Sequence, residues 1–86
     1  MIIHFYGGAQ DHTGSLDSIE ISGSPDIRAL IDSLGERFGS DFKQILLGSE
    51  TFFFLVNGKG TMQTGGFATK LSPGDKIEIL PFIDAG

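Results

Sequence analysis

The stretch that decides the fold is SPDIRALIDSLGERFG, residues 24–39. Apolar side chains recur in it at the i, i+3, i+4, i+7 and i+11 spacing of a single helical face, namely Ile27, Leu30, Ile31, Leu34 and Phe38. Ser24 is the expected N-cap, with Pro25 at the first helical position and Asp26 in the first turn. Gly39 is the expected stop. The stretch therefore predicts one amphipathic helix whose apolar face must be covered by another part of the chain.

Two β-prone segments precede this helix. Residues 1–6, MIIHFY, run up to Gly7-Gly8, and residues 15–22, SLDSIEIS, alternate around Ile19 and Ile21. A polar loop that contains glycine joins the two segments, and such a connection is typical of paired neighbouring strands. We expect an N-terminal hairpin.

Three further segments follow the helix. Residues 41–47, DFKQILL, predict a short helix or turn, and residues 51–60, TFFFLVNGKG, predict a strand that ends in an Asn-Gly turn. Pro73-Gly74-Asp75 predict a turn into a last strand within residues 76–82, KIEILPF. Pro81 should end the ladder of that strand because proline has no N–H to donate.

This order of elements predicts an α+β fold in two layers, with one long helix packed across a mixed sheet of four to five strands. A chain of 86 residues is long enough for one domain, which we place at residues 1–81. We expect residues 82–86 to form a flexible tail, since no helix or strand period continues there. Phe82 and Ile83 are apolar enough to fold back on the sheet edge.

Composition excludes several classes of function. A formal charge of −5 with only six Lys and Arg residues makes nucleic acid an unfavourable partner. The absence of cysteine removes disulfides, thiolate metal ligands and a cysteine nucleophile from consideration. The first residues lack the pattern of a signal peptide, and no stretch approaches the ~20 apolar residues of a membrane span, so we expect a cytoplasmic protein without a membrane partner.

Motifs for catalysis within the domain are lacking. His4 and His12 have no second histidine or carboxylate at the i, i+4 spacing of helical metal ligands, so we expect solvated histidines and no metal site. The glycines of NGKGTMQTGG, residues 57–66, match neither phosphate-binding loop motif. No serine lies in a nucleophile motif. The sequence does not favour an enzyme.

The run TFFFLV, residues 51–56, is apolar on both faces of its predicted strand. Phe52, Phe54 and Val56 should meet the helix. We expect Phe53 and Leu55 to form an exposed apolar patch that docks a partner. The alternative is that the loop GTMQTGGFATKL, residues 60–71, covers that second face.

Three segments together carry a family resemblance: FYGGAQDHTG at residues 5–14, VNGK at 56–59, and LSPGDKIEILPFIDAG at 71–86. They resemble the MoaD/ThiS family of ubiquitin-like β-grasp sulfur carriers over the whole chain. The closing motif is matched by Leu71, Gly74, Asp75, Ile77, Ile79, Leu80 and Pro81. Length and the start of the chain favour the MoaD side, the small subunit of molybdopterin synthase.

The resemblance implies that the terminal carboxylate, here on Gly86, is adenylated and thiocarboxylated to donate sulfur in molybdopterin or tungstopterin biosynthesis. It implies an ATP-using activating enzyme and a synthase large subunit as partners, with no cofactor bound by the carrier itself. The residues that would thread into the partner are Phe82, Ile83, Asp84 and Ala85.

The family usually ends in Gly-Gly, whereas this chain has Ala85 before Gly86. An extended tail tolerates alanine, but a partner that requires positive φ would not, because that conformation costs a non-glycine residue ~1–2 kcal/mol. The alternative function is therefore a non-conjugating β-grasp module that binds proteins, or a ubiquitin-like protein modifier.

Overall fold

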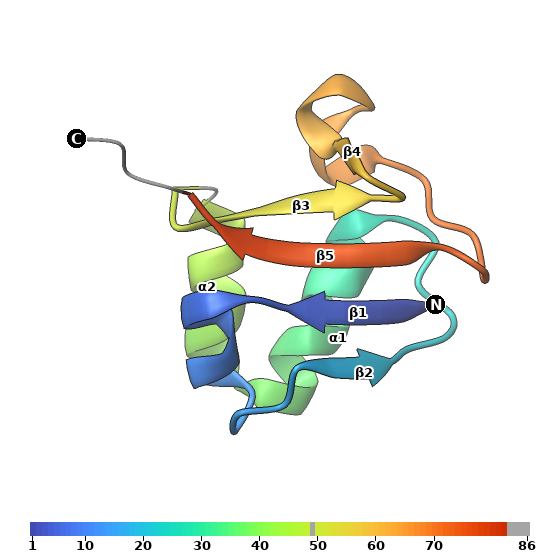
Figure 1. The fold of residues 1–86 in the computed structure, drawn as a ribbon. Helices are drawn as coiled ribbons and strands as arrows, with labels where there is room; N and C mark the ends of the chain where they lie inside the picture. Colours follow the sequence, from blue (N-terminus) through green and yellow to red (C-terminus); the bar gives the residue numbers. More distant parts are fainter. Residues whose placement is uncertain (49, 83–86) are drawn as a thin grey trace.

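The computed structural model describes residues 1–48 and 50–82, which form a five-stranded mixed sheet with its helices on one face (Figure 1). The strands are β1 (Ile2–Phe5), β2 (Ser18–Glu20), β3 (Phe52–Val56), β4 (Lys59–Gly60) and β5 (Lys76–Pro81). The α-helices are α1 (Ile27–Phe38) and α2 (Ser40–Gly48), and the short 3-10 helices are η1 (Gly7–His12), η2 (Thr61–Gln63) and η3 (Gly66–Ala68). None of the described helices is long and apolar enough to cross a membrane.

The strand order is β2-β1-β5-β3-β4. The two central strands, β1 and β5, run parallel, with Ile3 opposite Ile77, whereas the other neighbours are antiparallel. The expected N-terminal hairpin is confirmed by the antiparallel pairing of β1 with β2. The expected α+β architecture with a mixed sheet is confirmed as well, and it is the β-grasp arrangement.

The core lies between the sheet and the two helices. The expected apolar face of α1 is buried at Ile27, Leu30, Ile31 and Leu34, while Phe38 is half-buried and packs against the same cluster. Phe52 and Phe54 are buried beneath the helices, and half-buried Val56 packs against them, as their parity in the strand predicts. α2 adds Phe42 and Leu46, so it belongs to the core layer.

The start of α1 differs from the sequence prediction. The N-cap is Asp26, whose carboxylate accepts from the N–H of Ala29 at 2.8 Å, so Ser24 is not the cap and Pro25 lies before the helix. The reason is tertiary: Pro25 accepts from the N–H of Leu71, and Asp26 pairs with Lys70, which keeps this segment extended. Gly39, with φ 110°, ends α1 as expected.

The start of β5 is held by a side-chain lock between two turns. Asn57, at φ 52° in the expected Asn-Gly turn, donates to the Asp75 carboxylate at 2.9 Å and accepts from the N–H of Lys76 at 3.0 Å. The other Asp75 oxygen accepts from the N–H of Ser72 at 2.8 Å. These hydrogen bonds, from the Ser72 backbone first and from Asn57 second, lower the pKa of Asp75. The lock explains why the closing motif needs an aspartate before the strand.

The far end of β5 differs from expectation. Pro81 does not end the ladder, because it lies opposite Phe52 and the next N–H, that of Phe82, donates to the carbonyl of Thr51 at 3.2 Å. Proline at this position loses one donor but leaves the register intact. The predicted domain boundary at residue 81 falls inside this ordered pairing, and the rest of the predicted tail, residues 83–86, lies outside the described residues.

Candidate functional site

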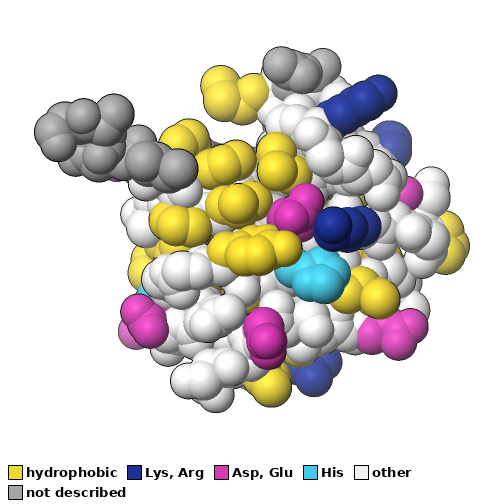
Figure 2. Space-filling model, in the orientation of Figure 1, with side chains coloured by type: hydrophobic (Ala, Val, Ile, Leu, Met, Phe, Trp, Pro, Cys, Tyr) yellow, Lys and Arg dark blue, Asp and Glu magenta, His cyan; other side chains and the backbone are white. Residues whose placement is uncertain are grey.

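The outer face of the sheet, which the helices leave uncovered, carries an apolar patch. Alternation places the side chains between the buried positions of β1, β3 and β5 on this face. We call Tyr6, Phe53, Leu55, Leu80 and Phe82 the outer-face patch; the first and last are 39% and 48% exposed and the other three are half-buried. Figure 2 shows apolar side chains gathered over this face, on the side toward the C-terminal end of β5.

The two residues expected to dock a partner, Phe53 and Leu55, both lie in this patch. Phe53 lies opposite Leu80, and its ring centroid is 5.0 Å from that of Phe82. Phe82 therefore folds back on the sheet, as the sequence suggested for it. Whether the patch binds a partner stays a prediction.

Phe53 and Leu55 are half-buried, so they are neither exposed as expected nor almost wholly buried, as full cover by the loop over residues 60–71 would require. Phe67 and Leu71 of this loop pack against the core cluster, and the loop is bonded to the start of α1, where Ile27 donates to the carbonyl of Thr69 at 3.2 Å. Met62 is 90% exposed. The loop thus closes one edge of the core near the start of α1.

A small polar group borders the patch. His4 lies opposite Glu78, and its ring stacks near that of Tyr6 with centroids 6.4 Å apart. The carboxylate of Glu78, chiefly through a hydrogen bond, raises the pKa of the Tyr6 hydroxyl. Within the described ranges, no cluster of three or more His, Asp or Glu side chains could hold a metal.

His12 is not the solvated side chain that the sequence suggested. Its ring stacks on Phe42 with centroids 5.0 Å apart and planes 7° from parallel, and Phe52 meets it edge-on at 6.2 Å. The imidazole is half-buried and fastens η1 to α2. We assign it a structural role.

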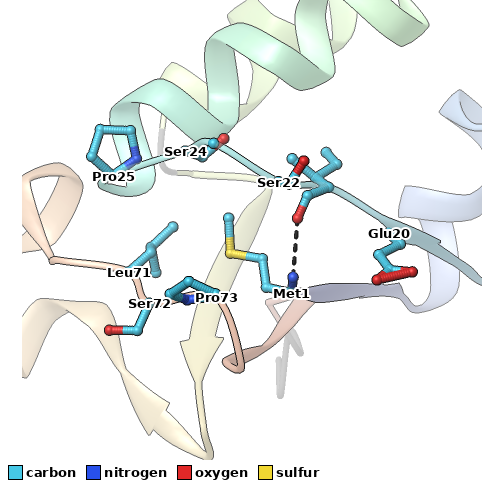
Figure 3. Close-up of a pocket in the computed structure, with 10 residues that line it drawn as sticks. Met1, Glu20, Ser22, Ser24, Pro25, Leu71, Ser72 and Pro73 are labelled. Atoms are coloured by element: carbon cyan, nitrogen blue, oxygen red, sulfur yellow. Dashed lines mark hydrogen bonds between the residues drawn. The ribbon is translucent and has the colours of Figure 1, made fainter.

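A concavity, shown in Figure 3, lies at the end of the sheet where β1 begins, away from the outer-face patch. It has a volume of about 510 Å³ and is bounded by the start of β1, the segment before α1 and the loop before β5. Its labelled wall includes Met1, Pro25, Leu71 and Pro73, and among its lining side chains only Glu20 is ionisable. Because β1 and β5 are parallel, this end is where both strands begin, a strand length away from where β5 delivers the tail.

The tail residues proposed to react or thread, Ile83, Asp84, Ala85 and Gly86, lie outside the described residues. What the structure supplies is the place from which they depart. Phe82, a member of the outer-face patch, is held by its N–H to Thr51 and by its ring against Phe53. A protein that covers the patch would therefore also meet the start of the tail.

The fold defines a class, the ubiquitin-like β-grasp proteins. A family model described as the ThiS family matches residues 3–86, so the chain belongs to the ThiS family of ubiquitin-like sulfur carriers. Members of this family are small carrier proteins. None of the curated proteins matches the chain.

Solved structures agree with this fold. CysO of Mycobacterium tuberculosis is similar with a TM-score of 0.83 and 25% identity, over 95% of this chain and 98% of that one. CysO in the BexX/CysO complex of Amycolatopsis orientalis gives 0.82 and 22%, over 99% and 98%. The small archaeal modifier protein 1 of Methanosarcina acetivorans gives 0.79 and 21%, over 99% and 94%.

Proposed function

We propose that this chain carries sulfur as a thiocarboxylate on the carboxyl group of Gly86. The observation that supports the proposal best is the family match, which runs through the closing motif to residue 86. The Asp75 lock and the β5 pairing give that motif a structural purpose, since they fix the strand from which the tail departs. The chain itself contains no cysteine, so its sulfur must come from another protein.

The chemistry requires an activating enzyme because a carboxylate is a poor electrophile. A carboxylate oxygen of Gly86 attacks the α-phosphorus of ATP and displaces pyrophosphate, which gives an acyl-adenylate. The terminal sulfur of a partner's persulfide then attacks the carbonyl carbon and AMP leaves. A thiol cleaves the resulting acyl disulfide, which leaves the thiocarboxylate on the carrier and a disulfide on the partner. The activating enzyme, and not the carrier, binds the ATP that is consumed in the first step.

The outer-face patch is the surface we assign to the activating enzyme. It includes Phe82, the last described residue before residues 83–86, so one partner can cover Phe53 and Leu55 and also receive residues 83–86. Apolar surface that is exposed in a small domain favours a protein partner of this kind. The complex of CysO with BexX concerns a protein of the same fold in association with a second protein.

For the sulfur acceptor we propose a pterin precursor held by a synthase large subunit, in molybdopterin or tungstopterin biosynthesis in the cytoplasm. This assignment rests on the resemblance to the MoaD side of the family. It is tested by adding the thiocarboxylated chain to that large subunit and its precursor and measuring sulfur transfer. Transfer to a different acceptor would retain the carrier function and replace the pathway.

The second candidate is a protein modifier or a binding module that uses the sheet without the thiocarboxylate. The similarity to the small archaeal modifier protein 1 and the presence of Ala85 in place of glycine favour this candidate. The two candidates differ in what becomes of the terminal carboxylate. A modifier ends in an amide bond to a lysine of another protein, whereas a binding module leaves Gly86 unchanged.

ATP–pyrophosphate exchange catalysed by the activating enzyme of the same organism tests the first step. We expect exchange with the wild-type chain and none after deletion of Gly86, because a one-residue slip displaces the carboxylate by about 3.3 Å or more and the reacting atoms must lie ~3–3.5 Å apart. Ala85→Gly is the matched control and should retain exchange. Exchange that persists at full rate without Gly86 would exclude it as the reacting residue.

A further inference from the structure

The cationic side chains of this acidic chain fall into two groups. Those on the helical layer are occupied: Arg28 and Lys43 pair with Asp32 at 3.7 and 3.1 Å, and Arg37 lies 5.7 Å from the centroid of the Phe38 ring. The remaining three, Lys59, Lys70 and Lys76, are exposed, and no ion pair to them is found among the residues that the structure describes. Half of the cations are thus left without an intramolecular role.

We call these three lysines, which lie around the Asn57–Asp75 pair, the lysine corner; Lys76 also lines a neighbouring hollow together with Glu20. Lys59 and Lys70 line the same hollow of about 360 Å³, together with Asn57 and Asp75. Lys76 directly follows Asp75, and its N–H is bonded to Asn57. In Figure 2, Lys and Arg side chains appear toward the β4 end of the view, away from the C-terminal side.

The backbone under this corner is held in place. Lys59 pairs with Val56 across the β3–β4 hairpin, Lys70 pairs with Asp26 at the start of α1, and Lys76 lies next to the Asn57–Asp75 lock. Asp75 is the only carboxylate in the lining of the hollow, and it already accepts from Ser72 and Asn57. The lining of this hollow therefore carries two lysines and one carboxylate, which is a net positive charge on a chain whose formal charge is −5.

The lysine corner and the outer-face patch lie along the same strand. Side chains in a strand alternate between the two faces, and Lys76 lies on the same face of β5 as Glu78 and Leu80, which is the outer face. Four residues at ~3.3 Å each separate Lys76 from Leu80, or about 13 Å. A partner that covers the patch and extends along β5 toward its beginning reaches Lys76, the member of the corner that lies on the outer face.

We propose that the lysine corner docks an acidic surface of the activating enzyme and sets the orientation in which the carrier approaches. This inference rests on the proposed function. The charge arrangement supports it. The carrier is acidic as a whole and so repels an acidic surface of the partner, whereas the lysine corner attracts that surface, and this contrast favours one orientation of approach. Apolar contact at the patch then holds the complex, while the corner chiefly accelerates its formation.

The experiment compares charge reversals that change the net charge equally. Lys59→Glu and Lys70→Glu act at the corner, and Arg37→Glu, exposed on the helical layer, is the matched control. The association rate constant with the activating enzyme of the same organism is measured by stopped flow at low and at high salt. Thermal unfolding confirms that each variant is folded.

We expect each lysine reversal to lower the association rate roughly 3- to 10-fold at low salt, with the difference shrinking at high salt, while Arg37→Glu stays within about twofold of wild type. Equal effects of all three variants would show that only net charge matters and would overturn the inference, as would a wild-type chain that does not bind the enzyme. Nucleotide exchange is measured separately at saturating carrier. A chain that binds with this charge pattern but supports no exchange would refute the carrier function alone.

Discussion

The ring centroids of Phe82 and Phe53 lie 5.0 Å apart. Phe82 directly follows Pro81, the last residue of β5, and its N–H donates to the carbonyl of Thr51. The last described residue of the chain is thus bound to the same strand that supplies the proposed docking patch. A substitution at Phe53 should therefore affect both the binding of the partner and the origin of the tail.

Phe53→Ala should weaken binding to the activating enzyme more than it weakens the fold. The side chain is half-buried, so we expect a loss of about 1–2 kcal/mol in the free energy of unfolding, measured in urea. Phe52→Ala, at a buried neighbour on the opposite face, should cost about 3–5 kcal/mol. If Phe53→Ala binds the activating enzyme with unchanged affinity, the patch is not the docking surface.

Asp75→Asn should lower stability at about pH 7 and matter progressively less in acid. The folded pKa of Asp75 lies below its ordinary value of 3.8, so the carboxylate contributes stability above the unfolded pKa, and that stability is lost as the pH falls through the folded pKa. Urea unfolding of both proteins across this acidic range is the measurement. A difference between them that stays constant with pH would contradict this role for the ionised carboxylate.

Gly35→Ala should destabilise the chain, although alanine is the better helix former by ~1 kcal/mol. The added Cβ would lie 2.8 Å from the Cβ of Lys43, where α1 and α2 approach each other, and the two helices would have to separate. Gly48→Ala is the matched control, because no atom of the described residues outside its own helix turn lies within 4 Å of the Cβ that alanine would add there. Thermal unfolding should show a lower midpoint for Gly35→Ala than for Gly48→Ala, and the reverse order would be inconsistent with this helix contact.

Asp26→Ala should cost about 1 kcal/mol of stability through loss of the cap on Ala29. Ser24→Ala tests the position that the sequence favoured for the same role. Because the Ser24 side chain does not cap α1, its removal should cost less than that of Asp26 in urea unfolding. Equal losses of stability in the two variants would mean that Ser24 and Asp26 both contribute to the N-cap, and would contradict this assignment.

Local patterns in the sequence predicted most of the fold. The helical spacing from Ile27 to Phe38, the stop at Gly39 and the Asn57 turn depend on neighbours a few residues away, and all three are confirmed. The cap was misplaced because the pairing of Asp26 with Lys70 joins segments far apart in the chain. Aromatic packing of His12 on Phe42 is nonlocal in the same way.

The candidate site was predicted less completely. Phe53 and Leu55 stood out because their strand is apolar on both faces, and both lie half-buried on the outer face. Tyr6 and Leu80 share the outer parity of their own strands, but only the parallel pairing of β1 with β5 brings them to the same patch. That pairing cannot be derived from either segment alone.

The most direct test of the carrier function is the intact mass of the wild-type chain after incubation with its activating enzyme, ATP and a sulfur donor, with the Gly86 deletion as control. The account predicts a mass gain equal to the exchange of one oxygen for one sulfur, confined to the C-terminal peptide and absent from the deletion variant. Wild-type chain and Ala85→Gly that both remain unmodified, under conditions where a Gly-Gly carrier of the same organism is thiocarboxylated, would contradict it.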